Sequence, residues 1–275
     1  MPKAVPTNKH EAKLRKAGHH LIAGVDEAGK GSWAGPLVTA AVILDETDIP
    51  KELFDSKMLT PQQRERAFVA IAKKALAWSV HVVQVSEIDK HGVHKANLAA
   101  LQRAVEKLHI SPDAVLVDAF KIAVANTPVI NIIDGDALER TIGAASIMAK
   151  VTRDRLMSSE VNRAYPHFHF QVHKGYGTSL HAKLLAMHGP TPEHRMSFEP
   201  VKNASKEKSA KPRNKRTAKK VSAKRGRNPA PKARSSGATG ARVAKKTTLF
   251  RTKPLKRSIK KKPARAKKRT ARKRR

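Results

Sequence analysis

The sequence predicts an α/β domain with a mixed sheet, preceded by a short segment and followed by a long basic tail. Apolar runs rich in β-branched residues alternate with segments of helical character along the first 200 residues. Those residues are nearly neutral, with 25 basic and 21 acidic side chains, whereas residues 201–275 hold 32 basic side chains and one acid. We therefore expect a flexible segment at 1–20, a folded domain at 21–201 and a disordered tail at 202–275.

Five apolar runs predict the strands of the sheet. The first two, residues 21–26 and 36–44, are joined through a glycine-rich stretch. Apolar and β-branched side chains dominate residues 78–85, and residues 114–119 form a short run that contains a carboxylate. Residues 129–133 complete the set. Helices between and after these strands would cover the sheet.

Capping residues mark the predicted helices. Thr60, Pro61 and Gln63 supply an N-cap, a first-turn proline and a capping-box partner. Gly189 and Pro190 close the last helix. A stripe of small residues runs through the longest helix, "ALERTIGAASIMAKVTRDRLMSSEV". Helices are expected over residues 61–76, 95–108, 137–161 and 179–189.

Composition restricts the class of function. A formal net charge of +35 indicates a polyanionic partner, and we expect the tail to bind nucleic acid without sequence preference. The chain has no cysteine and no run of about 18 apolar residues, and its basic first twenty residues lack the apolar region typical of a secretory signal, so none is expected. We therefore expect a cytoplasmic protein that associates with the nucleoid through its tail. A histone-like DNA-binding protein is an alternative, but it gives no role to the acidic residues described below.

The stretch "GVDEAGKGS", residues 24–32, is similar to the start of a phosphate-binding loop, G-x-x-x-x-G-K. Gly31 stands where such a loop needs Ser or Thr to hold Mg²⁺. Asp26 and Glu27 also place two negative charges inside a loop that would receive phosphate. The stretch is therefore interpreted as something other than a nucleotide-binding loop.

Acidic residues stand at the ends of three predicted strands: Asp26 with Glu27, then Asp118, then Asp136. Converging carboxylates repel one another unless cations neutralise them, and oxygen ligands suit Mg²⁺ or Mn²⁺. Adjacent strand residues point to opposite faces, so Asp26 and Glu27 share a site only if the strand breaks between them. Asp136 has an equally good interpretation as a helix N-cap, with Glu139 as its capping-box partner.

Six sequence blocks occur in the order and at the spacing typical of bacterial ribonuclease HII. They are "AGVDEAGKGSWAGPLVTAAVIL", "DSKMLT", "VLVDA", "GD" at residues 135–136, "AASIMAKVTRDRLM" and "HKGYGTSLHAKLLAMHGPTPEHRMSF". The resemblance covers about residues 21–201 and implies a ribonuclease H-like mixed sheet flanked by helices, with a C-terminal helical part. It implies an endonuclease that hydrolyses the phosphodiester 5′ to a ribonucleotide in RNA/DNA hybrids or duplex DNA, leaving a 3′-hydroxyl and a 5′-phosphate. We expect a monomer.

The resemblance also implies roles for individual residues. Asp26, Glu27 and Asp118 would bind Mg²⁺ or Mn²⁺, and Asp136 would be the fourth catalytic acid, close to the leaving group. The family senses the 2′-hydroxyl through a Gly-Arg-Gly backbone and a tyrosine. The residues implied to bind substrate are Gly29, Lys30, Gly31, Ser56, Lys57 and Tyr176, with Lys150, Arg153 and Lys174 as weaker candidates for phosphate contacts.

Several positions depart from the family pattern. Lys30 replaces the usual arginine, which keeps the charge but loses the bidentate fork. "VDAFK" stands where the family has Asp-Gly-Asn, so the turn after Asp118 can differ, and "DGD" adds Asp134. A histidine-rich stretch suggests zinc but lacks a second ligand pair, so we expect structural or surface histidines. These histidines are His167, His169 and His173.

The remaining alternative is an enzyme of the ribonuclease HIII class, or another metal-dependent nuclease of the same fold. This alternative predicts poor cleavage at a single embedded ribonucleotide and good cleavage of long RNA/DNA hybrids. The motifs do not distinguish Mg²⁺ from Mn²⁺ as the working metal.

Overall fold

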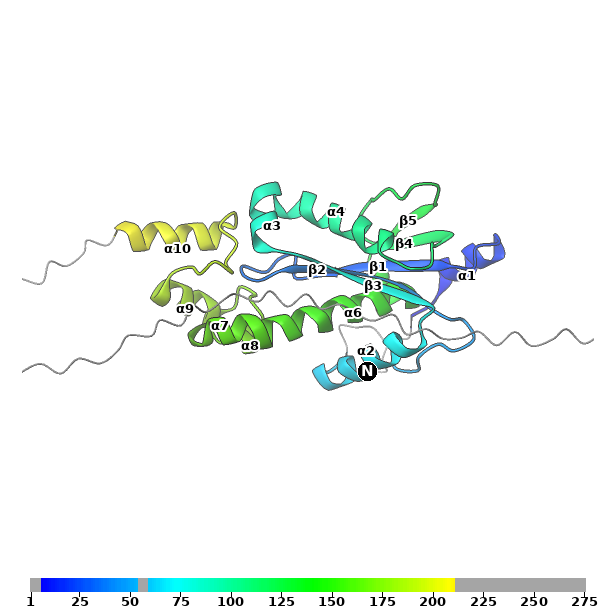
Figure 1. Ribbon diagram of the computed structural model, residues 1–275, viewed down its shortest axis with the longest axis horizontal. Coiled ribbons are helices and arrows are strands. Elements are labelled where there is room, and N and C mark those ends of the chain that lie inside the picture. The colour runs from blue at the N-terminus through cyan, green and yellow to red at the C-terminus, as the bar shows by residue number, and fades with distance from the viewer. Residues whose placement is uncertain (1–5, 54–58, 211–275) are drawn as a thin grey trace, which may run out of the picture. The chain divides into compact units, whose positions relative to one another are not determined.

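The computed structural model describes residues 6–53 and 59–210 of the chain (Figure 1). Its centre is a five-stranded sheet in the order β3-β2-β1-β4-β5. The first three strands of the chain pair antiparallel, whereas β4 and β5 extend the sheet in parallel with β1. This confirms the predicted mixed sheet. The strands are β1 (Ile22–Ala28), β2 (Leu37–Ile43), β3 (Ala77–Val83), β4 (Ala114–Asp118) and β5 (Val129–Ile132).

Helices cover both faces of the sheet, with α3 and α4 on one side and α2 and α6 on the other (Figure 1). Further short helices follow α6. No helix within the described part of the chain is long and apolar enough to cross a membrane. The helical segments are α1 (Lys9–Lys16), α2 (Pro61–Lys74), α3 (Val85–His91), α4 (Val93–Glu106), α5 (Gly135–Leu138), α6 (Arg140–Leu156), the π-turn η2 (Met157–Val161), α7 (Asn162–Ala164), the 3₁₀ turn η3 (Pro166–Phe168), α8 (Phe170–His173), α9 (Ser179–His188) and α10 (Glu199–Ala210).

Strand alternation decides which face each side chain of β1 reaches. Ala23 and Val25 pack in the apolar cluster that includes α4, whereas Gly24 lies under the start of α6. Because successive residues of a strand point to opposite faces, Asp26 faces α6 and Glu27 faces α4. The two neighbouring acids are thus divided between the two halves of the core.

Gly24 lets α6 begin directly against the sheet. A Cβ atom at this position would lie 2.0 Å from the carbonyl carbon of Thr141, so any side chain would force the helix away. The close approach brings Ser146, on the second turn of α6, next to Asp26. One glycine in β1 therefore positions a residue of the site described below.

Helix α1 is packed against the domain. The buried Glu139 carboxylate accepts hydrogen bonds from the backbone N–H groups of His10 (3.0 Å) and Glu11 (3.1 Å). In return, the buried Glu11 carboxylate accepts from the N–H (2.8 Å) and hydroxyl (2.9 Å) of Thr141. Each acid therefore satisfies the free N–H groups at the start of the other's helix, α1 or α6. This part of segment 1–20, expected to be flexible, is instead a docked helix.

The predicted long helix over 137–161 is interrupted. Glu139 is extended, with φ −121° and ψ 133°, and separates α5 from α6. Asp136 lies inside α5, while Asp134 occupies the N-cap position with φ 55°. The N-cap interpretation of Asp136 is therefore wrong, because its proposed capping partner Glu139 binds α1 instead.

The C-terminal helices form their own apolar cluster. Phe168 and Phe170 stack with ring centroids 5.3 Å apart and pack with Ala34, Met157 and Val201. Helix α10 continues to residue 210, beyond the expected start of the tail at 202, because its first turns pack in this cluster. The rest of the expected tail, residues 211–275, lies outside the described residues.

Candidate active site

The four acids gather at one end of the parallel strands. Parallel pairing of Val25 with Val117 makes Asp26 and Asp118 the next residues along two adjacent strands. The Asp118 Oδ1 atom accepts a hydrogen bond of 2.7 Å from the N–H of Gly135, in the turn that carries Asp136. The fold thus brings together acids that are separated by more than 100 residues in the sequence.

The strand does not break between the first two acids. β1 stays paired with β2 through Asp26–Ala40, Glu27–Thr39 and Ala28–Val38, so the break that a shared site was expected to require does not occur. The pairing of β1 with β4 instead ends at Val25, which leaves the edge beside the acids open. The two carboxylates, although on opposite faces, both act on Asp118 across this edge.

Burial makes the carboxylates costly to ionise. Desolvation, then the charge of Glu27, raises the pKa of Asp26 well above its usual range, against a hydrogen bond from Ser146. Desolvation raises the pKa of Glu27 to about 7, with Asp118 and Asp136 contributing and the Asn97 amide and Lys30 opposing. The Oε2 atom of Glu27 is buried and makes no hydrogen bond with the described residues.

The carboxylate oxygens of these side chains are suitable ligands for a divalent cation, although they are not close enough together to form a complete coordination site. No group of three or more Asp, Glu, His or Cys side chains in the described ranges is arranged to hold a metal as it stands. The donors are all carboxylate oxygens, which Mg²⁺ and Mn²⁺ prefer. The partnerless Glu27 Oε2 and the raised pKa values both indicate that a positive charge would stabilise the cluster.

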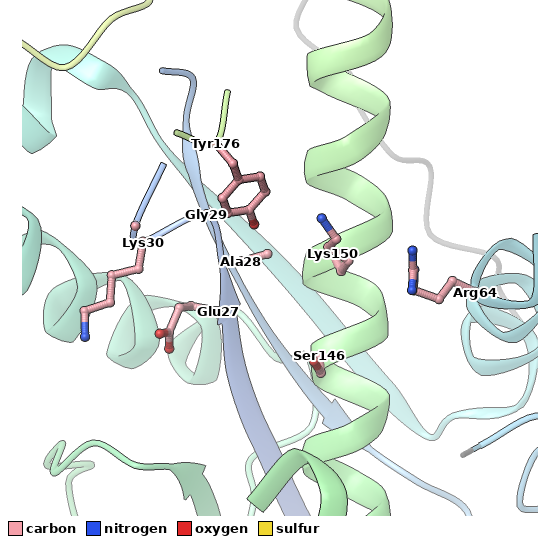
Figure 2. A pocket seen from close by; sticks show the side chains of 9 residues that line it. Glu27, Ala28, Gly29, Lys30, Arg64, Ser146, Lys150 and Tyr176 are labelled. Atoms are coloured by element: carbon pink, nitrogen blue, oxygen red, sulfur yellow. The ribbon is translucent and has the colours of Figure 1, made fainter. Parts of the chain in front are cut away.

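A cavity of about 420 Å³ opens beside Glu27. Figure 2 shows Glu27 and Lys30 on one side of β1, with Ser146 and Lys150 projecting from α6 on the other. The cavity brings together most of the residues that the family resemblance implied for substrate. Its lining consists of Glu27, Ala28, Gly29, Lys30, Gly31, Arg64, Ser146, Lys150 and Tyr176.

Two cations flank the ring of Tyr176. The Nζ atom of Lys150 lies 5.1 Å from the ring centroid and the guanidinium carbon of Arg153 lies 5.0 Å from it. In Figure 2 the tyrosine hydroxyl points toward the cavity, next to Gly29. On the far side of the loop, Lys30 places its Nζ atom 4.0 Å above the ring of Phe120. Phe120, in the segment "VDAFK", thus contacts Lys30, the residue that replaces the arginine typical of the family.

The weaker phosphate candidates divide into different roles. Arg153 is fully buried and binds backbone carbonyls, so it is not a surface contact for phosphate. Lys150 lines the cavity and pairs with Asp154 at 2.8 Å. Lys174 binds Ser158 and the carbonyl of Gln171 outside the cavity lining. The predicted phosphate contacts Ser56 and Lys57 lie outside the described residues.

The turn after Asp118 holds an alanine where the family has glycine. Ala119 adopts φ 54°, the left-handed region that favours glycine. Its N–H still binds the carbonyl of Ile132 at 2.9 Å. An alanine therefore bears a backbone strain of about 1 kcal/mol to hold Asp118 in place.

The histidines are structural or exposed, as expected. His167 and His169 are exposed, whereas buried His173 accepts from the N–H of Gly175 and binds the carbonyl of Phe168. Two further buried histidines, His181 and His194, form a hydrogen bond between their Nε2 atoms at 3.0 Å. His181 Nδ1 then binds the carbonyl of Tyr176 at 2.9 Å.

Sequence reasoning missed four residues of this region. Ser146 was quoted only as part of the small-residue stripe, and Arg64 carries no signal beyond its place in α2. Asn97 is a buried amide on α4 next to Glu27. Arg195 sits in the quoted block that ends "HRMSF", but its contacts with residues 30 and 35 follow only from the fold.

Solved structures share this arrangement of sheet and helices. The ribonuclease H2 from Pyrococcus horikoshii superposes with a TM-score of 0.60 at 27% identity, over 69% of this chain and 99% of that one. Bst-RNase HIII in complex with Mn²⁺ superposes with a TM-score of 0.56 at 20% identity, over 67% and 68%, which supports the fold alone. The fold and the carboxylate site define a hydrolase of the ribonuclease H type.

Sequence comparison then gives the family. The family model for Ribonuclease HII matches residues 23–201. The Ribonuclease HII of Acidothermus cellulolyticus is 49% identical over 71% of this chain, which spans 64% of that relative's length. The Ribonuclease HII of a Nocardioides species is 46% identical over 71% of this chain and 82% of its own. The chain belongs to the ribonuclease HII family, whose members are metal-dependent endoribonucleases that act on RNA/DNA hybrids.

Proposed function

We propose that this chain hydrolyses the phosphodiester on the 5′ side of a ribonucleotide, in RNA/DNA hybrids or embedded in duplex DNA, and leaves a 3′-hydroxyl and a 5′-phosphate. The observation that supports this most directly is the cavity in which Glu27, with a buried and partnerless oxygen, faces Lys30 and Tyr176. The cavity thus combines an acidic side chain that suits a metal ion with basic and aromatic side chains that suit nucleic acid.

Asp26, Glu27 and Asp118 are proposed to hold Mg²⁺ or Mn²⁺, with Asp136 as the fourth acid. A bound divalent ion supplies activation of the attacking water and neutralisation of charge at phosphorus. The backbone N–H of Gly135 fixes the orientation of Asp118, and the N–H of Glu27 fixes Asp26 at 2.7 Å. These two bonds pre-organise the donor oxygens before metal arrives.

The opposite wall is proposed to select the ribose. The backbone N–H groups of Lys30 and Gly31 donate to no acceptor among the described residues, so both are available to a ligand in the cavity. The Tyr176 ring is fixed by its cation neighbours and by the bond from His181 to its carbonyl. Two free donors and a fixed hydroxyl suit recognition of a 2′-hydroxyl, which both donates and accepts.

The test is cleavage of a duplex that carries one ribonucleotide, with Mg²⁺, with Mn²⁺ and with chelator. A nick 5′ to the ribonucleotide that requires metal is expected, and an all-DNA duplex serves as the control. A long RNA/DNA hybrid separates the two enzyme classes: poor cleavage at the single ribonucleotide beside good cleavage of the hybrid would favour the ribonuclease HIII alternative.

We also propose that residues 211–275 bind nucleic acid non-specifically. This segment carries 29 basic side chains and no acid. Each phosphate that it neutralises adds roughly 0.9 to the slope of log affinity against log salt on duplex DNA. Deleting residues 211–275, beyond the packed helix α10, should leave cleavage intact and lower that slope by about 9 if a third of the charges engage. Equal slopes for both proteins across a salt series would contradict the proposal.

A further inference from the structure

Two arginine side chains are completely buried next to the cavity. Arg153 on α6 and Arg195 near the C-terminal helices are both 0% exposed. Neither forms a salt bridge with a carboxylate among residues 6–53 and 59–210. Burying a guanidinium without an anion is expensive unless its N–H groups are satisfied in another way. Hydrogen bonds to backbone carbonyl groups stabilise the two buried guanidinium groups.

Besides a side-chain interaction of Arg153 with Tyr176, the two groups donate five hydrogen bonds to backbone carbonyls, all within one short segment, residues 30–36. Arg195 donates from Nη1 to Lys30 (2.8 Å), and from Nε and Nη2 to Gly35 (3.1 and 2.9 Å). Arg153 donates from Nε to Pro36 (2.9 Å) and from Nη2 to Ala34 (3.1 Å). The segment is therefore held by its carbonyl groups from the protein side.

Gly29 makes this arrangement possible. It has φ +90°, and a Cβ atom there would lie 1.9 Å from the Nε atom of Arg153. The guanidinium consequently packs directly under the loop backbone, with no side chain between them. Its Nη1 atom is buried and has no hydrogen-bond partner in the described chain. Its face lies 5.0 Å from the ring centroid of Tyr176.

The same loop presents its two free N–H donors, from Lys30 and Gly31, at the cavity. A peptide unit whose carbonyl is fixed on the inner side must direct its N–H toward the other side, because the unit is planar and trans. The carbonyl of Lys30, bound by Arg195, belongs to the peptide unit that carries the N–H of Gly31. Arg195 therefore orients that donor directly.

We propose that Arg153 and Arg195 are positioning residues for ribonucleotide recognition: they hold the carbonyls of residues 30–36 inward, so that the backbone N–H group of Gly31, next to that of Lys30, faces the sugar-phosphate of the substrate. The proposal rests on the function proposed above. A lysine could carry the charge but could not span two carbonyl groups in one plane, which explains why the fork of arginine is used. Neither arginine touches substrate.

The first test replaces each arginine by lysine, Arg153→Lys and Arg195→Lys. Arg155→Lys is the matched control, since Arg155 lies on the same helix α6 but is exposed and paired with Glu65. Binding of a duplex with one ribonucleotide and of its all-DNA counterpart is measured in chelator, and KM and kcat in Mg²⁺. Circular dichroism and thermal melting report the folded fraction.

For the two lysine variants we expect KM to rise about tenfold, with a smaller change in kcat, because one or two oriented hydrogen bonds to substrate are lost. The preference for the ribonucleotide over all-DNA duplex should fall by a similar factor, whereas the control keeps both values. Folded lysine variants with unchanged KM and unchanged preference would overturn the proposal. A merely structural role would lower the amount of active enzyme without altering KM.

A second pair of variants serves if the lysine substitutions prevent folding. Gly31→Pro removes one N–H donor, and Gly31→Ala keeps it; no atom lies within 4 Å of a Cβ added at this position. The proline variant should lose ribonucleotide preference relative to the alanine variant. Equal preference in the two variants would overturn the proposal. If the wild-type protein fails to cleave, the proposed function itself is contradicted, whereas cleavage by wild type beside unaltered variants contradicts only the role of the arginines.

Discussion

Two buried clusters of like charge border the same cavity, and they are stabilised in opposite ways. The guanidinium groups of Arg153 and Arg195 are met by carbonyl groups of the protein itself. The carboxylates of Asp26 and Glu27 are not met in full, since burial raises both pKa values and one oxygen of Glu27 has no hydrogen-bond partner in the described chain. Carbonyl groups of the protein therefore hold the basic cluster, although the Nη1 atom of Arg153 has no partner in the described chain, whereas the acidic cluster keeps repelling charges that a cation would neutralise.

This difference separates two uses of a buried charge. Burial, followed by the charge of Arg153, lowers the pKa of Arg195 to about 9, so Arg195 remains charged at neutral pH and holds its loop at all times. The acidic cluster stores unfavourable energy that a metal ion would release on binding. Disturbing the basic side should therefore alter structure and binding, while disturbing the acidic side should alter activity and, in the opposite direction, stability.

The largest expected effect comes from the acidic side. Asp118→Asn should lower the cleavage rate on the order of 10³-fold, because a neutral amide cannot replace a metal-binding carboxylate in stabilising charge. The variant keeps Oδ1 as an acceptor for the N–H of Gly135, so its melting temperature should change little. Single-turnover cleavage and thermal melting are measured together, with the exposed Asp48→Asn as control. Near-normal cleavage by Asp118→Asn would remove this acid from the mechanism.

On the basic side, Gly29→Ala should destabilise the protein by about 2–4 kcal/mol, because a side chain must occupy a left-handed backbone and displace Arg153. Gly31→Ala provides the contrast, since its Cβ would meet no atom within 4 Å. Urea denaturation of the two variants gives the comparison directly. Similar unfolding free energies for both variants would show that the Arg153 side chain moves aside at little cost and does not fix the loop.

The metal-free acidic cluster should become more stable when one charge is removed. Since the folded pKa of Glu27 is raised from 4.5 to about 7, ionisation opposes folding; the cost begins as pH rises above 4.5 and is complete above 7. Glu27→Gln should therefore stabilise the protein in chelator by about 2–3 kcal/mol at pH 8, and by little at pH 4.5. Thermal melts at both pH values are decisive. A variant less stable than wild type at pH 8 would mean that the carboxylate is better solvated than its burial indicates.

The smallest expected effect concerns the turn that holds Asp118. Ala119→Gly should stabilise the protein by about 0.5–1 kcal/mol, because glycine removes the left-handed strain of φ 54° at some cost in unfolded-state entropy. Ala125→Gly is the matched control and should destabilise slightly, because Ala125 is exposed in a turn and does not itself have a positive φ. Equal changes in melting temperature would show that the turn at Ala119 is not strained.

The sequence predicted the sheet well because apolar runs report burial directly. It also indicated that Asp26, Asp118 and Asp136 would meet, since each ends or follows a strand and parallel strands share an edge. Strand alternation suggested that Asp26 and Glu27 could share a site only if the strand broke between them. The structure needs no break, because β1 extends beyond its pairing with β4 and both faces of the unbroken strand border the open edge. Pairing lengths of this kind depend on the whole sheet and leave no local pattern.

Contacts across long distances in the sequence escaped prediction altogether. Arg195 binds the carbonyl of Lys30, 165 residues away, and a basic residue near the end of the domain gives no sign of such a partner. Glu139 fitted a capping box with Asp136 by spacing, but the fold directs its carboxylate to α1. Sequence spacing therefore suggested the wrong partner for Glu139, because its actual partner on α1 is distant in the sequence.

The exchange of carboxylates between α1 and α6 also bears on how the chain is made. Glu11 leaves the ribosome long before Thr141, its partner 130 residues later, so during synthesis α1 has nothing to dock against. An isolated helix of eight residues is unstable in water. The first helix of the domain should therefore be among the last to form, and it closes over the start of α6 only after the five strands have been synthesised.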